Sequence, residues 1–196
     1  MKRKIDIIKD TCIPLMIDDI DTDQLVPARF MKTVKKDGFG DVLLYDRRYD
    51  AEGNARKDFV LNNPAYHGSI FVVGKNFGTG SSREHAAWAI AGYGIKVVIS
   101  SKFADIHKGN ELNNFILPVE VSEEFVKRLA KCVTDNPETV VEVNLPEQTV
   151  TNTVTGETVS FEIDKYKKHC LINGLDDVDY LVGTKTDIEK WETKNL

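Results

Sequence analysis

The chain has 196 residues, of which 41% are hydrophobic and 29% are charged, and its formal net charge at pH 7 is −5. This length and composition are typical of one globular domain with its own core, and the acidic balance argues against a general nucleic-acid binder. No apolar run approaches the roughly 20 residues of a membrane span, and charges within residues 5–10 interrupt any signal-peptide core, so we expect a cytoplasmic protein.

The cysteines are few and far apart, at Cys12, Cys132 and Cys170. Cys-x-x-Cys spacing does not occur, so the sequence does not predict a self-contained zinc or iron–sulfur site. We interpret the three thiols as buried or incidental side chains in a reducing compartment.

The first half of the chain contains a predicted strand and turn, followed by a long region without a clear secondary-structure pattern. An apolar run at 12–17 predicts a strand, and the four aspartates in residues 18–23 predict a solvated acidic turn. Residues 28–68 lack clean periodicity apart from a short helix near 39–45. A stretch of this length with weak structure is usually functional or mobile in a compact domain.

From residue 69 the pattern alternates between strands and helices, which indicates βαβ crossovers and some parallel sheet. The expected strands are 69–73, 96–100 and 115–119, and the expected helices are 82–92, 103–113 and 122–132. Ser122 is placed to cap the last of these helices.

After Pro137 the pattern changes to antiparallel strands with tight turns. We expect these strands at 140–145, 148–151 and 158–163, followed by helices at 164–173 and 175–181. The sequence therefore predicts an α/β fold with a mixed sheet, in one domain over 1–183. The polar tail 184–196 is either a frayed end or a segment that docks on a partner.

A glycine-rich segment at 74–85, Gly-Lys-Asn-Phe-Gly-Thr-Gly-Ser-Ser-Arg-Glu-His, lies between an apolar strand and a helix-like run. Glycines allow close backbone approach, and a helix start offers unpaired N–H groups, so this order predicts an anion site. Arg83 adds a fork that can hold a carboxylate or phosphate. The spacing matches neither a dinucleotide fingerprint, a P-loop nor a nucleophile elbow, so we expect an anion other than a nucleotide.

The adjacent serines leave two interpretations open. Ser81 and Glu84 have the spacing of a capping box, in which Ser81 would be the helix N-cap. With two hydroxyls available, one can cap the helix while the other faces a ligand.

Three motifs together resemble the mobile, swivelling domain of the aconitase family, and the resemblance covers about residues 12–120. They are Asn-Phe-Gly-Thr-Gly-Ser-Ser-Arg-Glu-His-Ala-Ala at 76–87, Asp-Thr-Asp-Gln-Leu-Val-Pro-Ala-Arg-Phe at 21–30, and Phe-Ala-Asp-Ile-His-Lys-Gly-Asn at 103–110 followed by Leu117-Pro118. The resemblance implies a β/β/α-type swivelling domain. It also implies a hydro-lyase reaction, in which water leaves a hydroxy-dicarboxylate and adds back the other way round.

The same resemblance implies roles for individual residues. Ser81 matches the serine that acts as the base, and Asp23 matches an aspartate that supports the proton network. Ser82 and Arg83 match carboxylate-binding positions, and Thr22 belongs to the substrate-binding motif of residues 21–30.

A second substrate arginine of the family has no clean counterpart here. The spacing after the early motif leads to Lys35, and Arg29 is the arginine that we assign to substrate binding. We expect residues 28–40 to discriminate between substrates.

The resemblance further implies a large partner subunit that carries a [4Fe–4S] cluster with one open iron, while this chain binds no cofactor itself. Elimination needs a Lewis acid for the leaving hydroxyl, and the partner's cluster would supply it. Two alternatives stay open: a small subunit of a related hydro-lyase that acts on a homoaconitate-, citraconate- or methylmalate-type acid, and a non-catalytic anion-binding module in which Ser81 only caps a helix.

Overall fold

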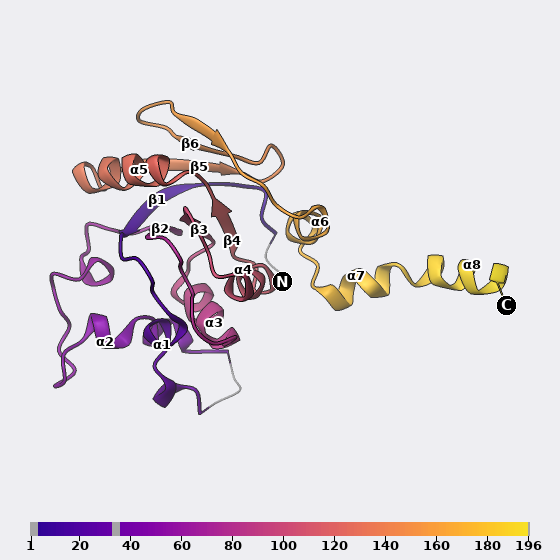
Figure 1. Cartoon of the computed structure of the whole chain (residues 1–196), viewed down its shortest axis with the longest axis horizontal. Helices are drawn as coiled ribbons and strands as arrows, with labels where there is room; N and C mark the ends of the chain where they lie inside the picture. The colour runs from indigo at the N-terminus through magenta and orange to yellow at the C-terminus, as the bar shows by residue number, and fades with distance from the viewer. Residues whose placement is uncertain (1–3, 33–35, 196) are drawn as a thin grey trace.

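A computed structural model describes residues 4–32 and 36–195 of the chain. Its centre is a seven-stranded sheet with the order β4-β3-β2-β1-β5-β6-β7 (Figure 1). The strands are β1 (Ile7–Leu15), β2 (Ile70–Val73), β3 (Val97–Ser100), β4 (Leu117–Glu120), β5 (Val140–Asn144), β6 (Thr149–Asn152) and β7 (Thr158–Ser160).

Strand β1 joins a parallel half of the sheet to an antiparallel half. Its C-terminal part, Cys12 to Leu15, pairs in parallel with β2, and its N-terminal part, Ile7 to Thr11, pairs antiparallel with β5. The predicted strand at 12–17 is therefore wrong at both ends. The sequence signal is weak before residue 12 because three consecutive polar residues, Lys9, Asp10 and Thr11, interrupt the apolar pattern there.

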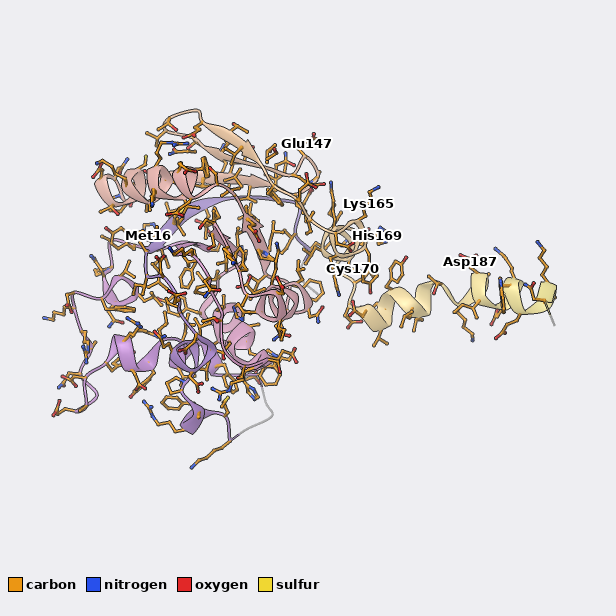
Figure 2. All side chains as sticks on the ribbon, in the orientation of Figure 1. Met16, Glu147, Lys165, His169, Cys170 and Asp187 are labelled. Atoms are coloured by element: carbon orange, nitrogen blue, oxygen red, sulfur yellow. The ribbon has the colours of Figure 1, made fainter. Side chains whose placement is uncertain are left out.

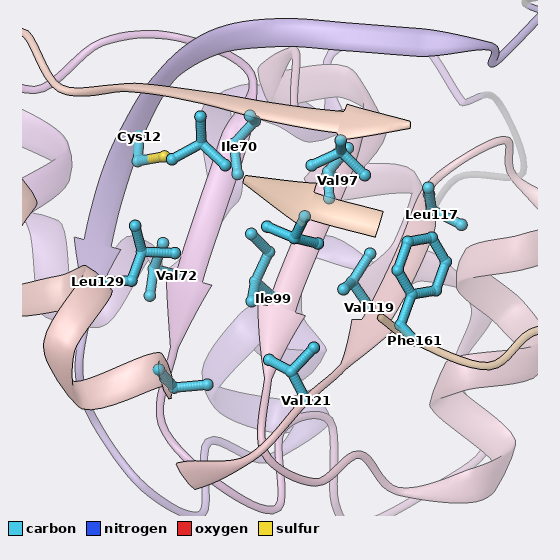
Figure 3. Packing of buried hydrophobic residues seen from close by; sticks show 14 of the residues in the cluster. Cys12, Ile70, Val72, Val97, Ile99, Leu117, Val119, Val121, Leu129 and Phe161 are labelled. Carbon is cyan, nitrogen blue, oxygen red and sulfur yellow. The ribbon is translucent and has the colours of Figure 1, made fainter. Parts of the chain in front are cut away.

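The two faces of the sheet carry separate apolar clusters. Helix α5 (Glu123–Asp135) packs on one face, where Ile70, Val72 and Leu129 meet (Figure 3). Helix α3 (Glu84–Tyr93) packs on the other face with Phe71. This division follows from the alternation of side chains along β2, all four of which are buried.

Five short helices lie along the described part of residues 22–62, separated by irregular segments, and η2 (Phe39–Val42) packs against α3. The backbone of Gly40 lies so close to that of Gly92 that a Cβ on Gly40 would fall 2.4 Å from the Gly92 carbonyl carbon. The short helices are α1 (Thr22–Leu25), η1 (Ala28–Phe30), η2 (Phe39–Val42), α2 (Tyr45–Arg48) and η3 (Val60–Asn62).

The remaining helices are α4 (Asp105–Asn113), α6 (Lys165–Asn173), α7 (Asp177–Gly183) and α8 (Lys185–Asn195). The caps follow the sequence: Ser122 accepts a hydrogen bond from the Phe125 amide at the start of α5, as predicted, and Asp164 does the same for Lys167 in α6. None of the described helices is long and apolar enough to cross a membrane.

Helices α7 and α8 extend away from the body of the protein, beyond α6 (Figure 1). Figure 2 shows Cys170 and His169 on α6, where the extension begins, and Asp187 far out along it. The described part of α8 has no buried residue, and the side chains of Val178 and Trp191 are 68% and 65% exposed. The sequence did not predict a helix at 185–195.

Candidate active site

The three sequence motifs lie side by side in the structure. Phe77 and Thr79 of the glycine loop bridge to neighbours on either side, Phe77 to Phe103 and Thr79 to Asp21, both in parallel. The Gly78 amide donates to the Ile20 carbonyl at 2.8 Å. The glycine loop therefore lies between the early motif (residues 21–30) and the third motif (residues 103–110) and is bonded to both.

Two consecutive residues of the short helix α1, Thr22 and Asp23, contact the end of the glycine loop. The Thr22 hydroxyl donates to the Ser81 carbonyl at 3.2 Å and lies 3.4 Å from the Ser81 hydroxyl. Asp23 forms an ion pair with Arg83, the side chains being 59% and 27% exposed. The structure therefore brings together four of the six predicted site residues, Thr22, Asp23, Ser81 and Arg83.

Two loop glycines are required by the geometry. Gly78 and Gly80 have φ angles of +77° and +100°, in the region that side chains with a Cβ rarely adopt. A Cβ at Gly80 would also lie 3.3 Å from the Thr22 hydroxyl oxygen. Glycine at these two positions is therefore needed for the loop to adopt the conformation that places Ser81 beside α1.

The predicted capping box is wrong. Helix α3 begins at Glu84 with Arg83 as its N-cap, and no side chain of the described residues caps its first turn. Ser81 is held instead by Thr22, and its carbonyl also accepts from the Arg83 amide at 2.8 Å. The bond from Thr22 is a tertiary contact that holds Ser81 outside the helix, so the Ser81 hydroxyl does not cap α3.

Glu84 has a different role from the one that the capping box predicts. Its carboxylate accepts from Asn114 Nδ2 at 2.9 Å and from Trp88 Nε1 at 3.1 Å. The Asn114 hydrogen bond is the main cause that lowers the pKa of this carboxyl, and the Trp88 bond and the charge of Lys36 add to it. Glu84 therefore fastens α3 to the end of α4.

The other predicted site residues are placed as follows. Ser82 is exposed beside Ser81. Arg29 is paired with Asp46, with Nη1 at 2.9 Å from Oδ2, and its guanidinium lies over the Phe30 ring at 4.7 Å. Lys35 lies outside the described residues.

The sequence predicts a solvated acidic turn at 18–23, but three of its carboxylates form hydrogen bonds within the protein. Asp18 accepts from the Lys75 amide at 2.9 Å, Asp19 from Asn76 Nδ2 at 2.7 Å. Asp21 caps α1 by accepting from the Gln24 amide at 2.7 Å. Asp18 and Asp19 thus fasten the acidic turn to the start of the glycine loop.

Sequence reasoning missed one cation near the site. Arg47 of α2 donates through Nε to Gln24 Oε1 at 3.0 Å, so it is one residue along α1 from the Asp23–Arg83 pair. Its only sequence signal was its place among several basic residues in the weakly periodic region.

The arrangement suits a small anion with hydroxyl or carboxylate groups. It offers one guanidinium, the amides of a helix start and the hydroxyls of Ser81, Ser82 and Thr22. Among the described residues, no group of three or more His, Cys, Asp or Glu side chains could hold a metal ion.

Comparison with known proteins agrees with this geometry. The family described as the aconitase C-terminal domain matches residues 3–124, and the family LeuD_N matches residues 127–165. The 3-isopropylmalate dehydratase small subunits of Azobacteroides pseudotrichonymphae and Cytophaga hutchinsonii are both 53% identical to the chain, over 94% of it and over 94% and 92% of their own lengths.

A solved structure is also similar. The 3-isopropylmalate dehydratase of Methanocaldococcus jannaschii superposes with a TM-score of 0.68 at 27% identity, covering 94% of this chain and 98% of that one. The mixed α/β fold and the resemblance inferred from the three motifs are thereby confirmed. The chain belongs to the aconitase C-terminal domain family, among the small subunits of 3-isopropylmalate dehydratases.

Proposed function

We propose that this chain is the small subunit of a hydro-lyase that interconverts 2-isopropylmalate and 3-isopropylmalate through isopropylmaleate, a step of leucine biosynthesis. One observation carries the proposal: the Thr22–Ser81 and Asp23–Arg83 contacts assemble one site in a chain that is 53% identical to small subunits of that enzyme. The proposed location is the cytoplasm.

In the proposed reaction, Ser81 takes the proton from the carbon next to the hydroxyl-bearing carbon. The electron pair of that C–H bond becomes the double bond, and the hydroxyl leaves as hydroxide. This hydroxide and the proton taken by Ser81 together make up the water that is lost. A serine hydroxyl is a very weak acid, so its alkoxide needs a positive environment prepared in advance. The uncapped start of α3 and the Arg83 guanidinium supply that environment.

The remaining roles follow from charge and position. Arg83 and Ser82 bind a substrate carboxylate, Thr22 holds Ser81 and adds a hydroxyl donor, and Asp23 orients Arg83 and supports proton transfer. Arg29 as a second carboxylate ligand stays a prediction, because in this structure its guanidinium is bonded to Asp46.

The proposed partner is a large subunit whose [4Fe–4S] cluster would act as the Lewis acid on the leaving hydroxyl. The residues of this chain bind and orient the dicarboxylate and hold the proton at Ser81 Oγ. We also propose that the tail 184–196 docks on that large subunit, because the described part of α8 exposes the apolar side chains of Ile188 and Trp191.

Reconstitution tests the function. The purified chain alone should be inactive, and adding the large subunit should start the interconversion of 2- and 3-isopropylmalate, followed by the absorbance of the unsaturated intermediate. Full activity without a partner would exclude the subunit role. Parallel assays with homoaconitate, citraconate and methylmalate decide between this substrate and its relatives, whose discrimination we assign to residues 28–40.

A further inference from the structure

Helix α4 buries two ionisable side chains that the proposed reaction does not use. The side chains of His107 and Glu111 are 1% and 0% exposed, and His107 Nε2 lies 3.1 Å from Glu111 Oε1. Within the described residues, none of the four polar atoms of these two side chains has a hydrogen-bond partner of good geometry, so the Nε2–Oε1 contact is close but poorly aligned. Such incomplete satisfaction is unusual for polar groups so fully removed from water.

The imidazole lies directly against the glycine loop. A Cβ on Gly78 would fall 2.1 Å from both Cγ and Cδ2 of His107, and the ring packs edge-to-face on Phe77 with centroids 5.5 Å apart. The loop and the helix are also joined by the Ala104 amide, which donates to the Phe77 carbonyl at 3.0 Å. The His107 ring thus packs against the glycine loop at Gly78, three residues before Ser81 in the chain.

This arrangement is costly for the fold. Burial raises the pKa of the Glu111 carboxyl, and the interaction with His107 opposes this. Apolar side chains of similar volume commonly replace such buried pairs with no loss of stability. Space filling alone therefore does not account for a histidine and a glutamate here, whereas a ring held against Gly78 by its close Nε2–Oε1 contact with Glu111 does.

We propose that His107 and Glu111 are positioning residues for the active-site loop. Glu111 fixes the orientation of the His107 ring, and the ring packs against Gly78. This packing determines the position of the glycine loop and therefore of Ser81 beside Thr22. The activity part of this inference depends on the proposed function. The structural part does not, so the two can fail separately.

Three variants test the proposal in the reconstituted two-subunit complex. Glu111→Leu removes the acceptor, and His107→Phe/Glu111→Leu removes both polar groups while keeping an apolar filling that should fold. Both should lower kcat at least tenfold and change KM less than threefold, because Arg83 and the helix start still bind the carboxylate. Glu111→Gln keeps an acceptor for His107 and should retain kcat within threefold.

A second readout does not depend on activity. Hydrogen exchange of the Gly78 amide, which is bonded to Ile20, should be at least tenfold faster in both leucine variants than in the wild type and unchanged in Glu111→Gln. The matched control is Val133→Ala, a buried change in α5 on the other face of the sheet, which should leave both readouts unchanged.

The outcomes separate cleanly. Wild-type kcat and wild-type Gly78 exchange in the folded double variant would overturn the proposal, and so would an equal loss in Glu111→Gln and Glu111→Leu. If the wild-type complex does not turn over isopropylmalate, the proposed function fails, while the exchange data still support or overturn the positioning role.

Discussion

Ser81 and Thr22 meet hydroxyl to hydroxyl at the place where the glycine loop reaches helix α1. Ser81 and Ser82 are exposed, and Arg83 is partly so, which leaves the proposed catalytic groups on an open surface of this chain. Electrostatic stabilisation of an alkoxide is effective only where water is excluded. The residues therefore form half of a site, and another surface has to cover it before Ser81 can act as a base.

Ser81→Ala should abolish turnover without unfolding the protein. Loss of a proton-transferring group costs about 10²–10⁴-fold in rate, and we expect kcat of the reconstituted enzyme to fall by that amount. Because Ser81 is not the helix cap, the free energy of unfolding should change by no more than about 0.5 kcal/mol, against about 1 kcal/mol for a lost cap.

Steady-state kinetics and urea denaturation measure both quantities, with Ser160→Ala in β7 as the control for loss of a serine hydroxyl. Full activity of Ser81→Ala would show that Ser81 is not the catalytic base.

Arg83→Lys should weaken substrate binding, because lysine cannot form the two parallel hydrogen bonds that a guanidinium offers a carboxylate. A charged hydrogen bond contributes about 1.5–3 kcal/mol, so kcat/KM should fall about 10- to 150-fold. Arg29→Lys is the matched variant. An unchanged KM there would limit Arg29 to its contact with Asp46, whereas a raised KM would confirm it as a substrate ligand.

At the scale of elements, the start of helix α3 shows where sequence reasoning reaches its limit. The capping-box spacing was correct as a local signal, but the bond from Thr22 to the Ser81 carbonyl, between residues far apart in the chain, delays the helix to Glu84. The loop, its glycines and Arg83 could be predicted because they are local. The partners of Ser81 and Arg83 could not be derived from spacing alone.

The same contrast holds elsewhere in the fold. Helix α5 and the antiparallel strands were predicted because their periodicity and caps are strong. The pairing of β1 with β5 depends on register between distant segments. The buried His107–Glu111 pair had one local signal, its i,i+4 spacing, which on sequence alone is equally typical of an exposed helix face.

Helix α4 should give the protein an unusual dependence of stability on pH. Burial, the largest cause, raises the pKa of Glu111 above its ordinary value of 4.5, while the hydrogen bond and charge of His107 and the charge of Lys108 oppose this. The folded protein therefore holds this proton more tightly than the unfolded chain. The resulting contribution to stability is complete below about pH 4.5 and is lost as pH rises toward the folded pKa.

Glu111→Gln should remove that loss. The free energy of unfolding of the variant minus that of the wild type should therefore increase with pH above 4.5, by up to about 1.4 kcal/mol per pH unit. Urea denaturation between pH 5 and 9 measures it, with the exposed Glu124→Gln in α5 as the control. Parallel curves for wild type and Glu111→Gln would contradict the prediction.

At the scale of the whole molecule, the sheet with its packed helices differs from the extension formed by α7 and α8. The seven-stranded sheet and its two apolar clusters hold the site, whereas α8 contributes no buried side chain in its described part. An exposed apolar side chain is ordinary on its own, but five on one pair of helices are the reason why we propose that a partner covers this surface. They are Val178, Leu181, Val182, Ile188 and Trp191.

Removing residues 184–196 should leave the melting temperature of the isolated chain nearly unchanged and weaken its binding to the large subunit. Trp191→Ala should reproduce most of that effect, because an exposed tryptophan is a frequent hot spot that contributes about 2 kcal/mol or more to binding, roughly 30-fold in Kd. Lys190→Ala, next to it, is the control. Equal affinities of the wild-type and truncated chains would show that the tail does not dock there.

Strand β1 also determines the order in which the chain can fold as it is synthesised. The parallel half of the sheet consists of Cys12 to Leu15 of β1 and of β2, β3 and β4. All of these strands have been synthesised once the chain reaches Glu120, so the glycine loop between them can form early. Ile7 to Thr11 must wait for β5 and until then present an unpaired edge on the nascent chain. The charges of Lys9 and Asp10 on that edge discourage premature pairing with other chains, so the residues that hid this strand from sequence analysis protect it during synthesis.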